Sequence, residues 1–210
     1  MISADGRFVA FASKATNLVP GDTNRRTDVF VHDRKLGRTE RVSVGSGGSQ
    51  GDRPSFGPSI SADGRFVAFE SRATTLTLGD TSPNEGVFVR DRQLGTTETV
   101  SVGPNGVHAR GHSHSPSISA DGRRVAFVSG AANLVQGDTD RVEDVFVRDR
   151  RARVTILASI GRGRERFRDG GILPSIAADG QAVAFASGDL VPEDTNGFQD
   201  VYIRLLRDRE

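Results

Sequence analysis

Apolar residues in this sequence gather in short runs separated by polar turns, and no run has the 3.6-residue period of an amphipathic helix. The segment from Pro58 to Ser115 predicts strands at residues 58–61, 66–71, 87–90 and 97–102. Residues 66–71 are apolar almost without alternation, which is typical of a strand covered on both faces. Residues 97–102 alternate polar with apolar positions, as expected of an outer strand with one face in water. The pattern therefore predicts four short antiparallel strands.

The turns and loops between these strands differ in length. Asp63-Gly64 predicts a tight hairpin turn, and residues 91–96 predict a second one. The loops at residues 72–85 and 103–115 are longer and rich in Gly, Ser, Thr and Pro. Because strand direction alternates, the two hairpin turns fall on one side of the sheet and the two long loops on the other. Variable loops on a rigid scaffold usually carry binding, so we expect any site on the long-loop face.

The whole unit repeats along the chain. Asp-Gly pairs begin at residues 5, 63, 121 and 179, always 58 residues apart, and each is followed by Val-Ala-Phe. A fixed period of this kind indicates a repeat architecture, and a β-sandwich gives no reason for it. We predict an all-β fold, a β-propeller in one domain over residues 1–210. Its four-stranded blades come from the repeats 1–57, 58–115, 116–173 and 174–210, with the first and last blades incomplete.

The repeated residues also resemble a known family. Ser-Ala-Asp-Gly-Arg with Val-Ala-Phe, then Asp-Val-Phe-Val-x-Asp-Arg, then Pro-Ser-Ile-Ser is similar to the repeat of TolB-type, WD40-like propellers, often called PD40 repeats. The similarity covers essentially the whole chain. It implies the propeller fold and suggests a periplasmic or secreted bacterial protein, although this chain shows no signal peptide. Family members include propeller domains of larger exported proteins, so the resemblance implies such a context here.

Composition narrows the classes of partner. The net charge is +1, which gives no bulk attraction toward nucleic acid or anionic lipid. No apolar run is long enough for a membrane-spanning helix, and the chain has no cysteine for disulfide or thiol chemistry. We therefore expect no nucleic-acid partner and no membrane span. Partners must be inferred from local features.

One recurrent loop motif carries oxygen ligands. Gly-Asp-Thr-Asn follows the second strand, and another Asp opens the third strand. Oxygen ligands in a Gly-containing loop suit Ca²⁺, yet the run lacks the bidentate Glu of a complete calcium loop. Asp and Asn also stabilise turns by bonding nearby backbone amides, which is the interpretation we favour. Cofactors are thus none or Ca²⁺, and the candidate ligands are Asp22, Asn24, Asp28, Asp138, Asp140, Asp144, Asp194, Asn196 and Asp200.

Two clusters occur in one repeat only. His108, His112 and His114 could bind Zn²⁺ or Ni²⁺, but no fourth ligand is identifiable, which favours a solvated polar loop. Arginines crowd residues 148–153 and 162–168, yet the blade pattern places the two groups on opposite faces. They cannot form one phosphate-binding surface.

No catalytic motif is present: the sequence has no nucleophile elbow, zinc-protease helix motif, phosphate loop or dinucleotide fingerprint. The favoured hypothesis is a non-catalytic propeller that binds a protein or a small ligand through its long-loop face. The alternative is a propeller enzyme that cleaves glycosidic or peptide bonds. Incomplete first and last blades also predict self-association through open blade edges.

Overall fold

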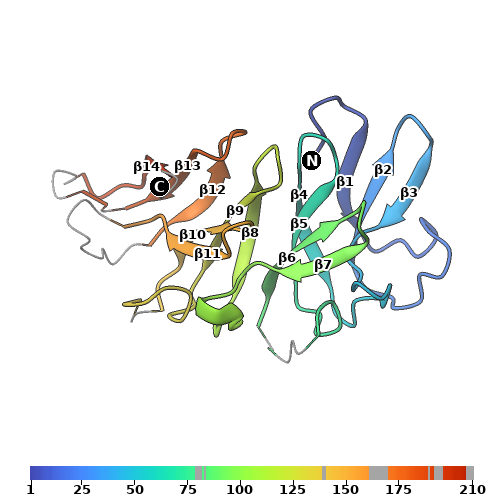
Figure 1. The fold of residues 1–210 in the computed structure, drawn as a ribbon, viewed down its shortest axis with the longest axis horizontal. Helices are drawn as coiled ribbons and strands as arrows, with labels where there is room; N and C mark the ends of the chain where they lie inside the picture. Colours follow the sequence, from blue (N-terminus) through green and yellow to red (C-terminus); the bar gives the residue numbers. More distant parts are fainter. Residues whose placement is uncertain are drawn as a thin grey trace.

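A computed structural model describes residues 1–78, 82, 84–138, 141–160, 170–188, 190–191 and 196–206. Within these ranges the chain forms separate antiparallel sheets and one short 3₁₀ helix, η1 (Pro104–Gly106). The chain passes through the sheets in order, and Figure 1 shows the first and last sheets at opposite ends of the molecule. The prediction of an all-β repeat fold is confirmed.

Each sheet corresponds to one repeat, and we call the sheets blades 1 to 4. Blade 1 contains β1 (Phe8–Ser13), β2 (Asp28–Asp33) and β3 (Arg38–Arg41). Blade 2 contains β4 (Ser55–Ile60), β5 (Phe66–Ser71), β6 (Gly86–Asp91) and β7 (Thr96–Thr99). Blade 3 contains β8 (Ser113–Ile118), β9 (Arg124–Ser129), β10 (Asp144–Asp149) and β11 (Val154–Leu157). Blade 4 contains β12 (Ile172–Ile176), β13 (Ala182–Ser187) and β14 (Asp200–Leu205).

Blades 1 and 4 each have three strands among the described residues, so the prediction that they are incomplete is also confirmed. In blade 1 the innermost strand is represented by a single bridge between Ile2 and Val9. In blade 4 the chain is described as far as Leu206, with β14 as the outermost strand of its sheet. One side of each terminal blade therefore has no neighbouring blade among the described residues.

The second and third strands of blades 2 and 3 form the core because both of their faces are covered. Every residue of β9 is buried, and Phe127 and Phe146 are fully inaccessible. These two rings stack across the strand pair with centroids 5.9 Å apart, and the same pairing recurs in the other blades at 5.8 to 6.2 Å. Offset stacking adds to the burial of these large side chains. These strands lack polar–apolar alternation because both of their faces are covered, as predicted from the sequence.

The innermost strands begin earlier than the sequence pattern indicates. β4 starts at Ser55 rather than Pro58, and its register against β5 shifts between Phe56 and Ser59. Gly57 lies in this bulge with φ +54°. Proline has no N–H for the ladder, and a bulge tolerates its absence. The same shift occurs before Ser117 and Ser175, so the bulge is a constant part of the blade.

Backbone hydrogen bonds join each blade to the next through the Asp-Gly turns. The Ala4 N–H donates to the Ala62 carbonyl at 3.0 Å, and Ala62 donates in the same way to Ala120. The Ala120 N–H donates to the Ala178 carbonyl at 2.9 Å. Adjacent blades are therefore fixed in the same relative orientation three times over.

The side chains at the first two of these interfaces form what we call the Arg–Phe clamp. The Phe8 ring of blade 1 lies against the backbone of Gly64 in blade 2: a Cβ at Gly64 would stand 2.2 Å from a ring carbon. The Arg92 guanidinium lies 4.5 Å from the centroid of the same ring. Arg92 also donates to the Gly64 carbonyl and pairs with Glu40 of blade 1. A cation over an aromatic face and a charged pair thus tie blade 2 to blade 1.

The clamp recurs between blades 2 and 3 with different residues. Phe66 lies against Gly122, again with 2.2 Å to a hypothetical Cβ, and Arg150 lies 4.5 Å from the Phe66 centroid. Arg150 donates to the Gly122 carbonyl and pairs with Glu98 at 2.6 Å. The two interfaces are therefore chemically equivalent.

The third interface exchanges the partners. Arg124 of blade 3 stands where Phe8 and Phe66 stand, and Leu206 of blade 4 stands where Arg92 and Arg150 stand. The Gly180 carbonyl still accepts from a guanidinium, because Arg124 donates to it at 2.8 Å from the opposite blade. Leu206 is buried instead of charged. The guanidinium–glycine contact is kept while its source changes sides.

Within blades 1 to 3 an Arg–Asp pair ties the first hairpin turn to the second. In blade 1, Arg7 donates to both carboxylate oxygens of Asp33, at 3.0 and 2.6 Å. The Arg7 bond, opposed by partial burial and aided by the N–H groups of Leu36 and Lys35, lowers the pKa of Asp33 to about 2. Blade 4 has Gln181 and Leu205 at these positions, so both charges are replaced together.

We predict that Gly64→Ala destabilises the protein more than Gly6→Ala. Both glycines have similar positive φ values, +74° and +70°, so both changes cost backbone strain. Only at Gly64 does the new methyl group collide with a phenylalanine ring, since the nearest atoms to a Cβ at Gly6 lie at 3.8 Å or beyond. Overpacking of this kind costs about 1–3 kcal/mol. Chemical denaturation measures the difference, and equal losses in the two variants would contradict the packing argument.

We also predict that the stability difference between wild type and Asp33→Asn depends on pH. A carboxyl whose pKa is depressed in the folded state stabilises the protein above its ordinary pKa of 3.8, and the contribution disappears as the pH falls through about 2. The melting temperature of Asp33→Asn should thus lie below that of wild type at pH 6 and converge with it between pH 4 and 2. A gap that stays constant over this range would show that Asp33 acts by packing alone.

Candidate functional site

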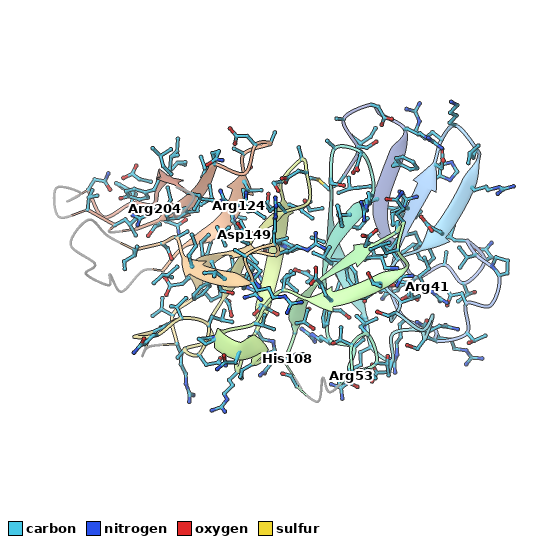
Figure 2. The ribbon with its side chains drawn as sticks, viewed as in Figure 1. Arg41, Arg53, His108, Arg124, Asp149 and Arg204 are labelled. Carbon is cyan, nitrogen blue, oxygen red and sulfur yellow. The ribbon has the colours of Figure 1, made fainter. Side chains whose placement is uncertain are left out.

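The loops with the greatest sequence variation lie on one side of the arc. Figure 1 shows η1 and its loop at the lower edge, while the turn between β12 and β13 lies at the upper edge. This is the arrangement that the alternation of strand direction predicts. Figure 2 places the labels of Arg53 and His108, both loop residues, along the same lower edge. We call this side the long-loop face.

In blade 1 the Gly-Asp-Thr-Asn loop closes around an arginine. The guanidinium of Arg41 lies 3.0 Å from Asp22 and 3.4 Å from Asp28. The three side chains are 9, 2 and 0 % exposed, so the charges neutralise each other out of contact with water. Asn24 donates to the same Asp28 oxygen, Oδ2, at 2.8 Å. Carboxylates buried in this way need a cation, and the chain supplies one from β3.

Gln50 joins the same network from the loop that leads to blade 2. Its amide nitrogen donates to the Gly21 carbonyl at 2.7 Å, and its oxygen accepts from Arg41 at 3.0 Å. The Ser43 hydroxyl donates to Asp28 at 2.6 Å and accepts from the Val29 N–H at 3.0 Å. The loop is therefore held by side chains from two connections and one strand.

Blade 2 lacks the key members of this network. Gly86 replaces the aspartate that opens the third strand, Thr99 replaces Arg41, and His108 replaces Gln50. Ser101 still accepts from the Val87 N–H at 3.0 Å, but no carboxylate exists at position 86 for its O–H to reach. Ser101 is 1 % exposed. A buried hydroxyl thus keeps its strand contact and loses the acceptor that its counterparts have.

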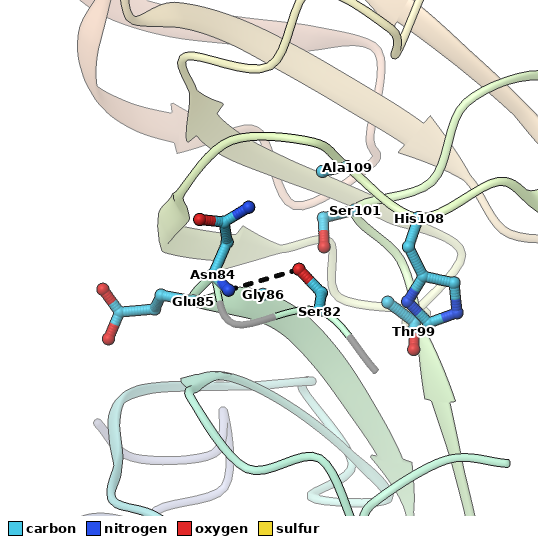
Figure 3. A pocket seen from close by; sticks show the side chains of 8 residues that line it. All are labelled: Ser82, Asn84, Glu85, Gly86, Thr99, Ser101, His108 and Ala109. Carbon is cyan, nitrogen blue, oxygen red and sulfur yellow. Dashed lines mark hydrogen bonds between the residues drawn. The ribbon is translucent and has the colours of Figure 1, made fainter. Parts of the chain in front are cut away.

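An open pocket occupies the place of the missing side chains. The pocket is shallow and open to solvent, and the empty space of about 210 Å³ within its outline includes the solvent at its mouth. Figure 3 shows the lining residues, with Ser101 toward the strands and His108 and Thr99 on one wall. The complete lining is Ser82, Asn84, Glu85, Gly86, Thr99, Ser101, His108 and Ala109. We call it the blade-2 pocket.

The other candidate calcium ligands are only partly described. In blade 3, Asp144 accepts from Ser159 at 2.6 Å, and Asp138 is buried. In blade 4, Asn196 donates to Asp200 at 3.0 Å. Asp140 and Asp194 lie outside the described residues. Among the described residues no group of three His, Cys, Asp or Glu side chains is placed to hold a metal, and calcium binding stays a prediction.

The three histidines separate along the chain. His112 accepts from the Glu85 N–H at 3.2 Å, and His114 bonds Glu143 at 3.0 Å. His108 lines the blade-2 pocket. The three side chains therefore have separate surroundings, as in the polar-loop interpretation.

The arginines of residues 148–153 also act locally. Arg150 belongs to the second clamp, and Arg148 donates to Thr155 at 3.1 Å. The pKa of Arg148 is lowered by burial, which is unfavourable for a residue that contacts phosphates in water. The arginines at residues 162–168 lie outside the described part of the chain.

Sequence reasoning identified the loops but missed the pocket. One sequence feature indicated it: Gly86 stands at a position where blades 1, 3 and 4 have an aspartate. What the sequence did not reveal is that Arg41, Gln50 and the aspartates share one enclosed volume. Because these side chains fill a common volume in blade 1, the absence of the aspartate in blade 2 leaves space for a site.

Comparison with known proteins rests on structure alone. No family model matches the sequence, and no curated protein matches it. TolB from Acinetobacter baumannii aligns with a TM-score of 0.54 and 15 % identity over 97 % of this chain. This chain spans 39 % of that TolB's length. The fold is therefore that of TolB and related WD40-like β-propeller proteins.

Proteins of other activities share the same fold. The β-propeller domain of the Trilobed protease from Pyrococcus furiosus aligns with a TM-score of 0.50 and 14 % identity over 98 % of this chain and 53 % of its own. An oligogalacturonate lyase from Vibrio parahaemolyticus gives 0.51 and 14 % over 96 and 46 %. These identities establish the fold and leave the activity open. No helix in the described residues is long and apolar enough to cross a membrane.

Proposed function

We propose that this protein is a non-catalytic propeller module that binds a ligand or a protein side chain through its long-loop face, at the blade-2 pocket. The observation that carries the proposal is that Gly86 replaces the aspartate that accepts from the equivalent serine in blades 1 and 3, while Ser101 remains in place. Blades 1 and 3 fill the equivalent position with the carboxylates of Asp28 and Asp144. A binding site at blade 2 accounts for why that blade alone lacks this aspartate.

The chemistry of the pocket indicates the class of ligand. In blades 1 and 3 a serine hydroxyl donates to a carboxylate oxygen at 2.6 Å. Ser101 has the same position and burial but faces Gly86. A carboxylate or a carbonyl oxygen supplied from outside would accept this donor and complete the bond that the chain does not make. An aspartate side chain of a protein partner fits the same description.

A binding role fits the lining better than the enzymatic alternative. Glycosidic hydrolysis uses two carboxyl groups that flank the scissile bond. Glu85 is the only carboxylate among the described residues that line the pocket, and Arg72 lies 3.5 Å from it. The resemblance of the repeats to TolB-type propellers supports a role as one portion of a larger exported bacterial protein.

Gly86→Asp tests the proposal, because it restores the side chain that fills the equivalent position in blades 1 and 3. Acetate, the smallest carboxylate, serves as the probe, with acetamide as its neutral counterpart. Titration followed by nuclear magnetic resonance should shift the amide signals of Ser101 and of the residues around it in the wild type. In Gly86→Asp the affinity should fall at least about tenfold, because the new carboxylate occupies the position of the probe.

Gly47→Asp is the matched control. Gly47 lies in the preceding connection, is exposed, and has no atom within 4 Å of a Cβ. It adds the same charge without entering the pocket, so binding should remain. Equal loss in both variants, or acetate shifts spread evenly over the surface, would refute the pocket. Turnover of a polysaccharide or peptide substrate that Gly86→Asp abolishes would favour the enzyme instead.

A further inference from the structure

The open side of blade 1 carries an arginine in the position of the clamp arginines. Arg34 is the counterpart of Arg92 and Arg150: its N–H donates to the Arg7 carbonyl at 2.9 Å, as theirs donate to Arg65 and Arg123. Its guanidinium donates to the Gly6 carbonyl at 2.8 Å, which repeats their bonds to Gly64 and Gly122. Arg34 is exposed, whereas Arg92 and Arg150 are covered by the preceding blade. Half of a third clamp is therefore already formed.

The rest of this face has the character of an interior surface. Val67 and Phe69 of blade 2 are fully buried against blade 1. Their counterparts in blade 1, Val9 and Phe11, are only partly buried, and Ile2 is 55 % exposed. The surface that blade 2 presents to its neighbour is thus repeated in blade 1 without a neighbour among the described residues.

The open side of blade 4 does not complement it. Ala182 stands where Phe8 and Phe66 stand, so blade 4 offers a methyl group in place of the clamp ring. Its third strand is apolar and exposed, with Val201, Ile203 and Leu205 at 76, 70 and 66 %. A second copy that docked blade 4 onto blade 1 would place Arg34 over alanine and leave it without an aromatic partner.

We propose that the open face of blade 1 binds a partner sheet that presents an aromatic ring and a carboxylate, placed as Phe8 and Glu40 are placed in blade 1. The occupant is a blade-like β-sheet with these two residues, and it is not a second copy of this chain. The two rings of this type that the chain has, Phe8 and Phe66, are already engaged by Arg92 and Arg150. Arg34 selects the partner by a cation–aromatic contact, while Val9 and Phe11 supply apolar area.

This inference is independent of the pocket on blade 2, because it concerns the side of another blade. It follows from continuity with two interfaces that have the same geometry within the chain. The two clamps also set the direction of the selectivity. In both, the arginine that bridges the interface comes from the later blade and the ring from the earlier one, whose own Arg7 or Arg65 also lies over the ring. Blade 1 is the later member of the interface that we propose.

Ala182→Phe supplies the missing ring and converts a second copy into a suitable partner. Sedimentation velocity should then detect head-to-tail association through blade 4 of one copy and blade 1 of the next. Ala182→Leu is the matched control, because leucine adds apolar area without an aromatic face. We expect Ala182→Phe to associate about tenfold more tightly than Ala182→Leu, as a partly desolvated cation–aromatic contact provides.

Arg34→Gln decides whether the arginine is responsible. In the Ala182→Phe background it should remove the tenfold gain, and in the wild-type background it should leave the association state unchanged. Equal association of Ala182→Phe and Ala182→Leu would overturn the proposal, as would wild-type self-association that depends on Arg34. Ala182→Trp provides a second ring in case the phenylalanine variant fails to fold, and the melting temperature reports folding in each case.

Discussion

The contact between a phenylalanine ring and the glycine of the following Asp-Gly turn fixes how the blades stack. A Cβ on Gly64 or Gly122 would lie 2.2 Å from the ring of Phe8 or Phe66, so only glycine permits the approach. The same glycines need positive φ to form the turn. One residue therefore satisfies a local turn and a long-range packing contact at the first two interfaces. The backbone bonds from Ala4 to Ala62 and from Ala62 to Ala120 accompany this approach, and the equivalent bond from Ala120 to Ala178 forms at the third interface without the ring. The arginine then covers the ring and caps the glycine carbonyl.

The third interface shows which part of this arrangement is essential. Phenylalanine becomes Arg124, arginine becomes Leu206, and the Gly180 carbonyl still receives a guanidinium. A Cβ at Gly180 would meet its nearest atom at 3.4 Å, so the tight approach is relaxed where the ring is lost. The charge changes sides at this interface and a leucine takes the place of the ring, while a guanidinium still caps the glycine carbonyl. The open face of blade 1 has the guanidinium and lacks the partner.

Much of the fold was predictable because the same pattern of strands and turns occurs four times in the sequence. The Asp-Gly turns, the doubly covered strands and the incomplete terminal blades all follow from spacing and from the lack of alternation at residues 66–71. The bulge at Gly57 was missed, since Pro58 suggests a strand start when the register against β5 is unknown. The clamp was visible only as Arg-Phe after Asp-Gly. The contact depends on Arg92, which comes from the same blade as Gly64, and on Glu40, which comes from the same blade as Phe8. These residues are far apart in the sequence, so no local pattern connects them.

The blade-2 pocket arises where one repeat departs from the residues that the other repeats share. In blade 1, Asp28, Arg41 and Gln50 form a closed network. Blade 2 has Gly86, Thr99 and His108 at these positions, and an opening remains there. A repeat protein can thus form a site where one repeat lacks a side chain that fills the equivalent position in other repeats. The scaffold stays intact because the clamps lie on the side of the hairpin turns, away from the long-loop face.

The central claim is that the ring of one blade and the arginine of the next are energetically coupled. A double-mutant cycle of Phe66→Leu and Arg150→Gln measures this coupling from the free energy of unfolding. The clamp predicts a favourable coupling of about 1 kcal/mol, the value expected for a cation–aromatic pair that is partly removed from water. Additive losses, with a coupling near zero, would show that the blades are joined by backbone bonds and apolar packing alone.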